Sequence, residues 1–400
     1  MSSSDLFTTV VAVPVAVPIS PMVPITPMMP ITPMVPIPFP DPIGMQSDTD
    51  INTTFSRTSM VDETFALKKQ GYATGLATAL VRSTRTVHPL RIWVVDNSGS
   101  MAIGDGTRIV DCGGPSKLKS VPCSRWDELS LAVEYHSQIS ALISAPTNFR
   151  LLNGALGGAS DFLVGENSDD VGHALDIMHK ASPGGATPLT EHVYAIKEMI
   201  APMAPNLRAK GQRVVVVIAT DGLPTNAEGY GGGEETNRFV TALRSLEGLP
   251  VWVVIRLCTD SKQVASFYNE LDSQLEMSLE VIDDFFQEAK EVHRHNPWLN
   301  YCLPLHRARE FGFQDRVLDY IDERPLSVAD LKMFCAMLFG DEKLSAIDPA
   351  QDWQLFSERV EFLVKNEKLN YNPIKKKEKP WISIGAMNRM YGPPWECVLM

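Results

Sequence analysis

The feature that most constrains the fold of this chain is a series of short, continuously apolar runs separated by segments of helical length. A strand that is apolar on both faces must be covered on both faces, which is typical of a parallel sheet. The runs are Leu90–Val95, Phe149–Leu152, Val214–Ala219, Val251–Ile255 and Leu279–Ile282. Their alternation with helical segments predicts a doubly wound α/β domain with a mostly parallel sheet over residues 85–300.

Helical segments are indicated by apolar residues at intervals of three and four, the spacing of one helix face. The clearest segment is Arg125–Ala145, where Ser124 and Asp127 have the spacing of a capping box. Other helices are expected at 169–180, 188–200, 235–246, 261–275 and 284–292. A lead-in helix is expected over residues 63–84, with Gly71 and Gly75 as its weak points.

Beyond Tyr301 the strand-like runs stop and helical patterns continue. Helices are expected at 315–323, 328–339 and 349–368. Their apolar stripes are interpreted as packing faces rather than as a cofactor site. The sequence therefore predicts a C-terminal helical region over residues 301–400, which its residues assign to no family.

Prolines recur at intervals of three from Pro18 to Pro36, the period of a polyproline II helix. A segment that lacks an N–H at every third residue, with no Lys or Arg before it, is expected to be neither a membrane span nor a signal peptide. Residues 1–62 are thus expected to form a disordered, Pro-rich head and linker. Whether the head is only a semi-rigid leader or also a ligand for SH3- or WW-type domains stays open.

The charge balance excludes some partners. With 36 basic and 48 acidic side chains, the chain has a net charge of −12, the wrong sign for binding nucleic acid or an anionic membrane. The six cysteines form no CxxC pair, so we expect reduced thiols and no bridge between Cys112 and Cys123. These features favour a cytoplasmic location, with the nucleus as an alternative.

Polar residues follow two of the apolar runs, where ligands bind in open parallel sheets. The first run leads into Asp96-Asn-Ser-Gly-Ser, and the third leads into Thr-Asp221-Gly. Carboxylate and hydroxyl oxygens are hard donors that suit Mg²⁺. A third segment, Gly-Gly-Ala-Thr-Pro-Leu, places the hydroxyl of Thr187 at the start of the helix that Pro188 begins.

These three segments resemble, in order, spacing and strand context, the metal-ion-dependent adhesion site of von Willebrand factor A (vWA) domains. The resemblance covers about half of the chain. It implies that Ser98 and Ser100 are direct ligands, that Thr187 is a direct ligand when a partner is bound, and that Asp96 and Asp221 hold metal-bound waters. The implied ion is Mg²⁺, with Mn²⁺ or Ca²⁺ as alternatives, and one coordination position is left for an Asp or Glu of a partner protein.

The leading hypothesis is therefore a non-enzymatic, metal-dependent protein-binding module. One alternative is a metal-dependent hydrolase, for which Asp105, Asp111 and Glu191 are the candidate general bases. Another is a scaffold that binds through the Pro-rich head and the helical tail, and a third is a metal-free α/β domain in which the site aspartates only cap loops. The long segment 102–124 is either a partner-selecting loop or a tolerated surface insertion.

Overall fold

The computed structural model describes residues 59–111, 118–155, 158–167 and 169–393. The predicted head, nearly all of its linker, and Cys112 lie outside these residues. Among the described residues, no helix has the length and apolar character needed to cross a membrane.

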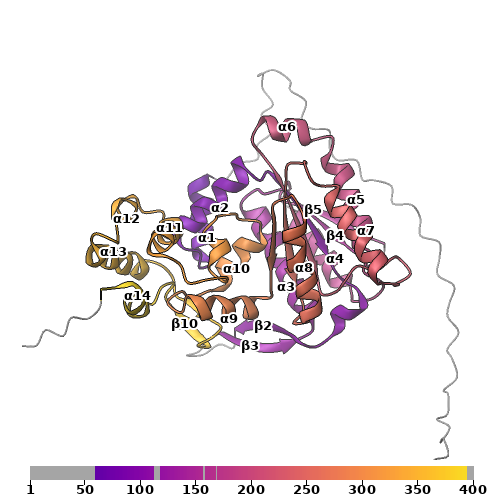
Figure 1. The fold of residues 1–400 in the computed structure, drawn as a ribbon. Helices are drawn as coiled ribbons and strands as arrows, with labels where there is room; N and C mark the ends of the chain where they lie inside the picture. Colours follow the sequence, from indigo (N-terminus) through magenta and orange to yellow (C-terminus); the bar gives the residue numbers. More distant parts are fainter. Residues whose placement is uncertain (1–58, 112–117, 156–157, 168, 394–400) are drawn as a thin grey trace, which may run out of the picture. The chain divides into compact units, whose positions relative to one another are not determined.

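A six-stranded sheet carries the strand order β5-β4-β1-β6-β7-β8 (Figure 1). All neighbouring strands are parallel except β5, which runs antiparallel to β4. The strands are β1 (Leu90–Val95), β4 (Thr147–Leu151), β5 (Asp161–Val164), β6 (Val214–Thr220), β7 (Val251–Leu257) and β8 (Leu279–Ile282). The predicted α/β class with a mostly parallel sheet is confirmed, and β5 is the strand that the sequence did not predict.

Helices cover both faces of this sheet because its strands alternate their side chains between two cores. In β1, Ile92 and Val94 pack with α5, α7 and α8, whereas Trp93 and Val95 pack with α3 and α4. These helices are α3 (Arg125–Leu142), α4 (Asp170–Lys180), α5 (Leu189–Ile200), α7 (Gly233–Arg244) and α8 (Lys262–Gln274). Helix α6 (Ala204–Ala209) adds to the core of α5, whereas the buried side chains of α9 (Phe285–His295) belong to a third core. The capping box predicted at the start of α3 is present.

A third core joins helices from the two ends of the described chain. It contains side chains of α1 (Met60–Lys69) and α2 (Thr74–Thr86) together with those of the C-terminal helices. Those helices are α10 (Leu303–Glu310), α11 (Val328–Phe339), α12 (Glu342–Ala346), α13 (Trp353–Lys365) and α14 (Ile384–Tyr391). Figure 1 shows α11 beside α2. The lead-in and C-terminal regions therefore share one buried interior.

The structure corrects three expected helices. The lead-in segment is two helices, with a turn at Gly71 between them. Within residues 315–323 only the 3₁₀ turn η2 (Leu318–Tyr320) forms. Acidic residues lie at what would be the C-terminal end of the helix, where the helix dipole favours cations, and a proline follows. The helix predicted from Pro349 begins at Trp353, because the Asp352 side chain caps it by accepting from Leu355 N at 2.9 Å.

Two hairpins were also not predicted. Within residues 102–124, η1 (Gly99–Ala102) leads into the antiparallel strands β2 (Gly106–Asp111) and β3 (Leu118–Cys123). The C-terminal region contains the pair β9 (Asn370–Asn372) and β10 (Lys377–Lys379). The C-terminal region is thus mainly, but not entirely, helical.

The buried carboxylate of Glu310 fastens α10 to the sheet. It contacts His136 Nε2 of α3 at 2.9 Å and Arg256 Nε of β7 at 3.2 Å. Burial raises the pKa of Glu310, but the charges of Arg307 and His306 outweigh burial and hold this pKa well below its usual range. Glu310 is therefore a charged group in the interior, held by partners from three elements.

We predict that Gly75→Ala destabilises the protein, because a Cβ at this position would meet main-chain atoms of Met337, Phe339 and Gly340 in α11 and its cap. Overpacking of this kind typically costs about 1–3 kcal/mol. Denaturant unfolding measures the change. Gly172→Ala in α4, where a Cβ meets nothing, is the matched control and should be neutral or stabilising; equal stability losses in the two variants would contradict the close packing of α2 on α11.

Candidate functional site

The candidate site lies where β1 and β6, adjacent strands at the centre of the sheet, end side by side. Val95 and Ala219 are paired in the ladder, so the residues that follow, Asp96 and Asp221, emerge at the same edge. Asp96 N continues the pairing by donating to Ala219 O at 2.9 Å. The sheet topology therefore brings the two predicted carboxylates into one site.

Asp96 is fully buried and holds the loop that follows it. Its Oδ1 accepts from Ser98 N at 2.8 Å, and its Oδ2 accepts from Thr220 Oγ1 at 2.6 Å. Burial and repulsion by Asp221 raise its pKa, the hydrogen bonds from Thr220 and Ser98 lower it, and the net result is a pKa of about 6. A carboxylate engaged on both oxygens in this way orders the loop that follows it.

A chain of hydroxyls connects the two loops. Ser98 Oγ lies 3.1 Å from Ser100 Oγ, and Ser100 Oγ donates to Asp221 Oδ1 at 2.8 Å. A hydroxyl that gives its hydrogen to a carboxylate leaves its lone pairs free for a cation. Four of the five predicted site residues, Asp96, Ser98, Ser100 and Asp221, are thus brought together directly.

The fifth residue, Thr187, belongs to a loop that is fastened against the first one. Gly184 N donates to Asn97 O at 2.8 Å, and Gly99 N donates to Gly185 O at 3.3 Å. Gly185 has a φ of +80°, and a Cβ there would strike Asn153, so both its conformation and its packing require glycine. These bonds place the loop of Thr187 beside the serine loop.

Thr187 is itself positioned by Thr225, in the segment after β6. Thr187 N donates to Thr225 Oγ1 at 2.9 Å, and Thr225 N donates to Thr187 O at 3.0 Å. The hydroxyl of Thr187 has no hydrogen-bond partner within the described part of the chain, although the residue is only 6% exposed. The main chain is fixed while the hydroxyl stays available as a ligand.

Arg125 is a site residue that the sequence analysis missed. It occupies the first position of α3, and its guanidinium donates to Asp221 Oδ2 at 2.8 Å. The guanidinium also donates to both carboxylate oxygens of Asp105, at 2.6 and 2.7 Å. The predicted capping box put the start of this helix at residue 125, and parallel topology puts that start at the carboxyl edge of the sheet. These two signals together could have located Arg125 at the site.

Two asparagines were missed as well. Asn97 Nδ2 donates to Asn153 O at 2.7 Å, and Asn153 N donates back to Asn97 Oδ1 at 2.8 Å. Asn153 Nδ2 also donates to Ala186 O at 2.9 Å, next to Thr187. Asn153 follows the second apolar run of the sequence, so the rule that singled out Asp96 and Asp221 could also have found it.

The donor set fits a hard divalent cation. Within the residues that the structure describes, no group of three or more His, Cys, Asp or Glu side chains is placed to hold a metal ion. The candidate site is of another composition, with two carboxylates and three hydroxyls, and the buried pair of Asp96 and Asp221 carries repulsion that a cation would relieve. The residues present are therefore compatible with Mg²⁺ and would leave it most of its charge.

The candidate general bases are bound to arginines where the structure describes them. Arg125 holds Asp105 and lowers the pKa of that carboxyl, and Arg238 contacts Glu191 at 3.2 Å. The side chain of Asp111 lies outside the described residues. The lowered pKa makes Asp105 a weaker base, so its pairing with Arg125 offers little support for hydrolysis through this residue.

No protein-family model matches this chain, and no curated protein matches its sequence.

We predict that, in EDTA, the free energy of unfolding of the Asp96→Asn variant rises relative to that of the unsubstituted protein as the pH increases. Because the folded-state pKa of Asp96, about 6, lies above its ordinary 3.8, the stabilising contribution of Asp96 is complete below about pH 4 and is lost as the pH rises through 6. The free energy of unfolding of the variant, relative to wild type, should therefore rise by up to about 3 kcal/mol between pH 4 and pH 8.

Denaturant unfolding across this pH range measures the difference. Asp105→Asn is the control of opposite sign, because the pKa of Asp105 is lowered and its stabilising contribution is present only above the ordinary value. If the difference in the free energy of unfolding between wild type and Asp96→Asn does not change with pH, folding does not raise the pKa of Asp96 and the prediction is wrong.

Proposed function

We propose that the chain is a metal-dependent protein-binding module of the vWA type. Ser98, Ser100 and Thr187 would hold a Mg²⁺ ion, with Mn²⁺ or Ca²⁺ as substitutes, and Asp96 and Asp221 would anchor its waters. When bound, the ion supplies a coordination position for the carboxylate of an Asp or Glu from a partner protein.

The observation that carries this proposal is the hydroxyl chain between the two central strands. Ser100 Oγ donates to Asp221 while Ser98 Oγ lies beside it, so both hydroxyls can turn lone pairs to the same point. Neutral hydroxyls leave a cation with more positive charge than carboxylate ligands would, which favours capture of an outside carboxylate. The loop contacts made by Asn97, Asn153 and Thr225 preorganise the site.

Binding is favoured over hydrolysis by the state of the neighbouring carboxylates. Asp105 and Glu191 are both engaged by arginines, so no described candidate base stands free beside the hydroxyls. The scaffold alternative, in which the Pro-rich head and the helical tail bind partners, depends in part on the head, which lies outside the described residues.

Calorimetric titration of Mg²⁺ tests the metal site. We expect one ion per chain for the unsubstituted protein and no detectable binding for Asp96→Ala or Ser98→Ala, which remove the loop anchor and a ligand. Ser266→Ala changes an exposed hydroxyl on α8 and should bind like the unsubstituted protein. Identical traces for wild type and Asp96→Ala would refute the site.

Water proton relaxation of the Mn²⁺-loaded protein tests the open coordination position. N-acetylglutamate amide should displace a water and lower the relaxation enhancement, whereas N-acetylglutamine amide should not, because only the first carries a carboxylate. An equal response to both compounds would contradict capture of an acidic residue.

Arg125 is expected to oppose the metal, because its guanidinium repels a cation and occupies Asp221 Oδ2. Arg125→Gln should therefore bind Mg²⁺ several-fold more tightly in the same calorimetric titration. Arg238→Gln, which removes an exposed arginine paired with Glu191 and Glu235, is the control and should leave the affinity unchanged. Weaker binding in Arg125→Gln would instead show that Arg125 supports the site.

A further inference from the structure

The outer edge of β8 presents main-chain groups that no described strand pairs. Among the described residues, β8 pairs with β7 alone. Val253 N donates to Ser278 O at 3.1 Å, and Val253 lies opposite Leu279. In a parallel ladder this register turns the N–H groups of Glu280 and Ile282 toward β7 and those of Leu279 and Val281 away from it.

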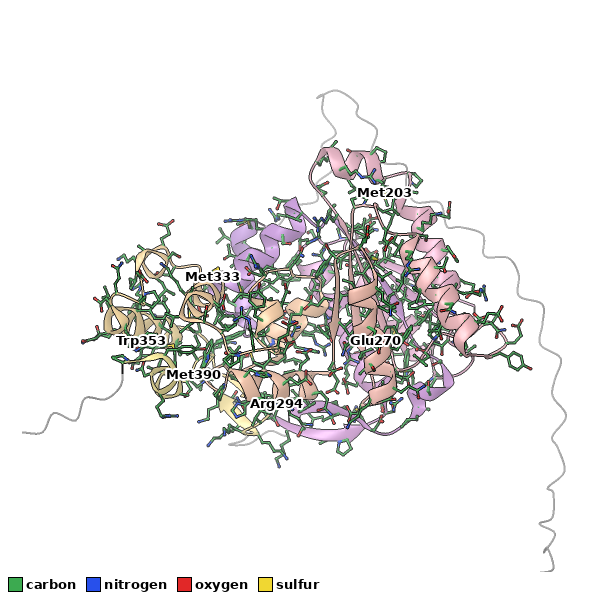
Figure 2. The ribbon with its side chains drawn as sticks, in the orientation of Figure 1. Met203, Glu270, Arg294, Met333, Trp353 and Met390 are labelled. Carbon is green, nitrogen blue, oxygen red and sulfur yellow. The ribbon has the colours of Figure 1, made fainter. Side chains whose placement is uncertain are left out.

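A groove with a volume of about 880 Å³ lies beside this edge. Its walls come from β8 and from α8, α9 and the segment 314–323. Eight of the lining residues are acidic and three are basic, and the basic ones include Arg294 of α9, labelled in Figure 2. The groove is thus an acidic channel along an unpaired strand edge.

The basic groups of the groove do not balance its carboxylates. Arg309 is already shared among Glu280, Glu288 and Asp322, at 2.8, 2.6 and 3.1 Å. Burial, together with the charges of Glu291 and Asp260, raises the pKa of Asp283 to about 6, so this carboxyl is still mostly ionised at pH 7. Negative charge therefore remains on the walls after the internal ion pairs are counted.

A buried donor in the wall also lacks an acceptor. The side chain of Trp252 lines the groove and is 4% exposed, and its Nε1–H has no hydrogen-bond partner in the described part of the chain. Buried indole N–H groups usually find such a partner. This N–H lies beneath the surface of the wall, so the accessible groups of the groove are main-chain groups and carboxylates, a combination suited to a polypeptide rather than to a small cation.

We propose that the edge of β8 and this acidic groove bind an extended, Lys- or Arg-rich segment of a partner protein, which adds a strand to the sheet. Main-chain pairing with Leu279 and Val281 would supply affinity, and basic side chains facing the walls would supply specificity. The chain's own head does not have this chemistry, because no Lys or Arg precedes Arg57. The proposal is independent of the metal site.

Fluorescence anisotropy of a labelled Lys-Val-Lys-Val-Lys-Val peptide, in EDTA, tests the proposal. The peptide should bind the full chain, and its Glu-Val counterpart should not. Val281→Pro removes an outward-facing N–H, which an edge strand tolerates, and exchanges a half-buried valine side chain for a proline ring. It should therefore weaken binding while the protein stays folded with only a small decrease in the unfolding midpoint. Hydrogen exchange at Leu279 and Val281 should slow when the peptide is bound.

Charge reversal on the wall gives a second measurement. Asp319 and Glu323 are exposed groove residues, and the double variant D319K/E323K should weaken binding about tenfold or more. The double variant E198K/E358K reverses two exposed carboxylates outside the groove and should bind like the unsubstituted protein.

Four outcomes would overturn the proposal. They are no binding of the Lys-Val peptide, equal binding of the Glu-Val peptide, binding that Val281→Pro leaves unchanged, and binding that D319K/E323K leaves unchanged. Spermine binding that is as tight as peptide binding would likewise show a cation site without strand pairing. Concentration-dependent dimerisation that Val281→Pro abolishes would assign the edge to a second copy of the chain instead.

Discussion

A buried carboxylate, that of Glu310, is the group on which the arrangement of this protein depends. Its partners come from α3, from β7 and from its own helix, and a buried charge is tolerated only when such partners surround it. Arg91 of β1 adds to the anchorage by donating to Phe311 O at 2.9 Å and lying over the Phe311 ring. Polar contacts therefore fix α10 and Phe311 to the sheet, and the ion pair of Arg309 with Glu280 of β8 adds a second attachment.

The same network reaches the candidate site. Arg256, which binds Glu310, also contacts Glu128 at 2.5 Å in the first turn of α3. That turn begins with Arg125, whose guanidinium binds Asp221. Buried charges thus help to set the orientation of α3. This orientation in turn sets the position of the Arg125 guanidinium beside the proposed metal ligands. A change at the C-terminal helices could reach the site through these ion pairs.

The predictable parts of the fold are those governed by apolar pattern and chain order. Buried strands such as β6 and β7 are continuous apolar runs, and adjacent parallel strands must end together, so the meeting of Asp96 with Asp221 followed from sequence. Helix α10 was not predicted, because its buried residues include His306, Arg309 and Glu310. With polar side chains at these positions, the helix shows no apolar periodicity in the sequence. The Asn97–Asn153 contact was missed because the apolar pattern does not say which strands are neighbours, and the pairing of β1 with β4 brings the two residues together.

The close approach of α2 to α11 has a consequence for how the protein folds during synthesis. Helices α1 and α2 leave the ribosome before the six-stranded sheet, yet the core that they complete also needs α11, which emerges only after that sheet. The apolar surface of α2 that packs on α11 therefore stays uncovered until all six strands of the central sheet have been made. A chain truncated before α11 would therefore leave part of the apolar surface of α2 exposed, although the hydrogen bond from Arg91 to Thr84 of α2 could still form.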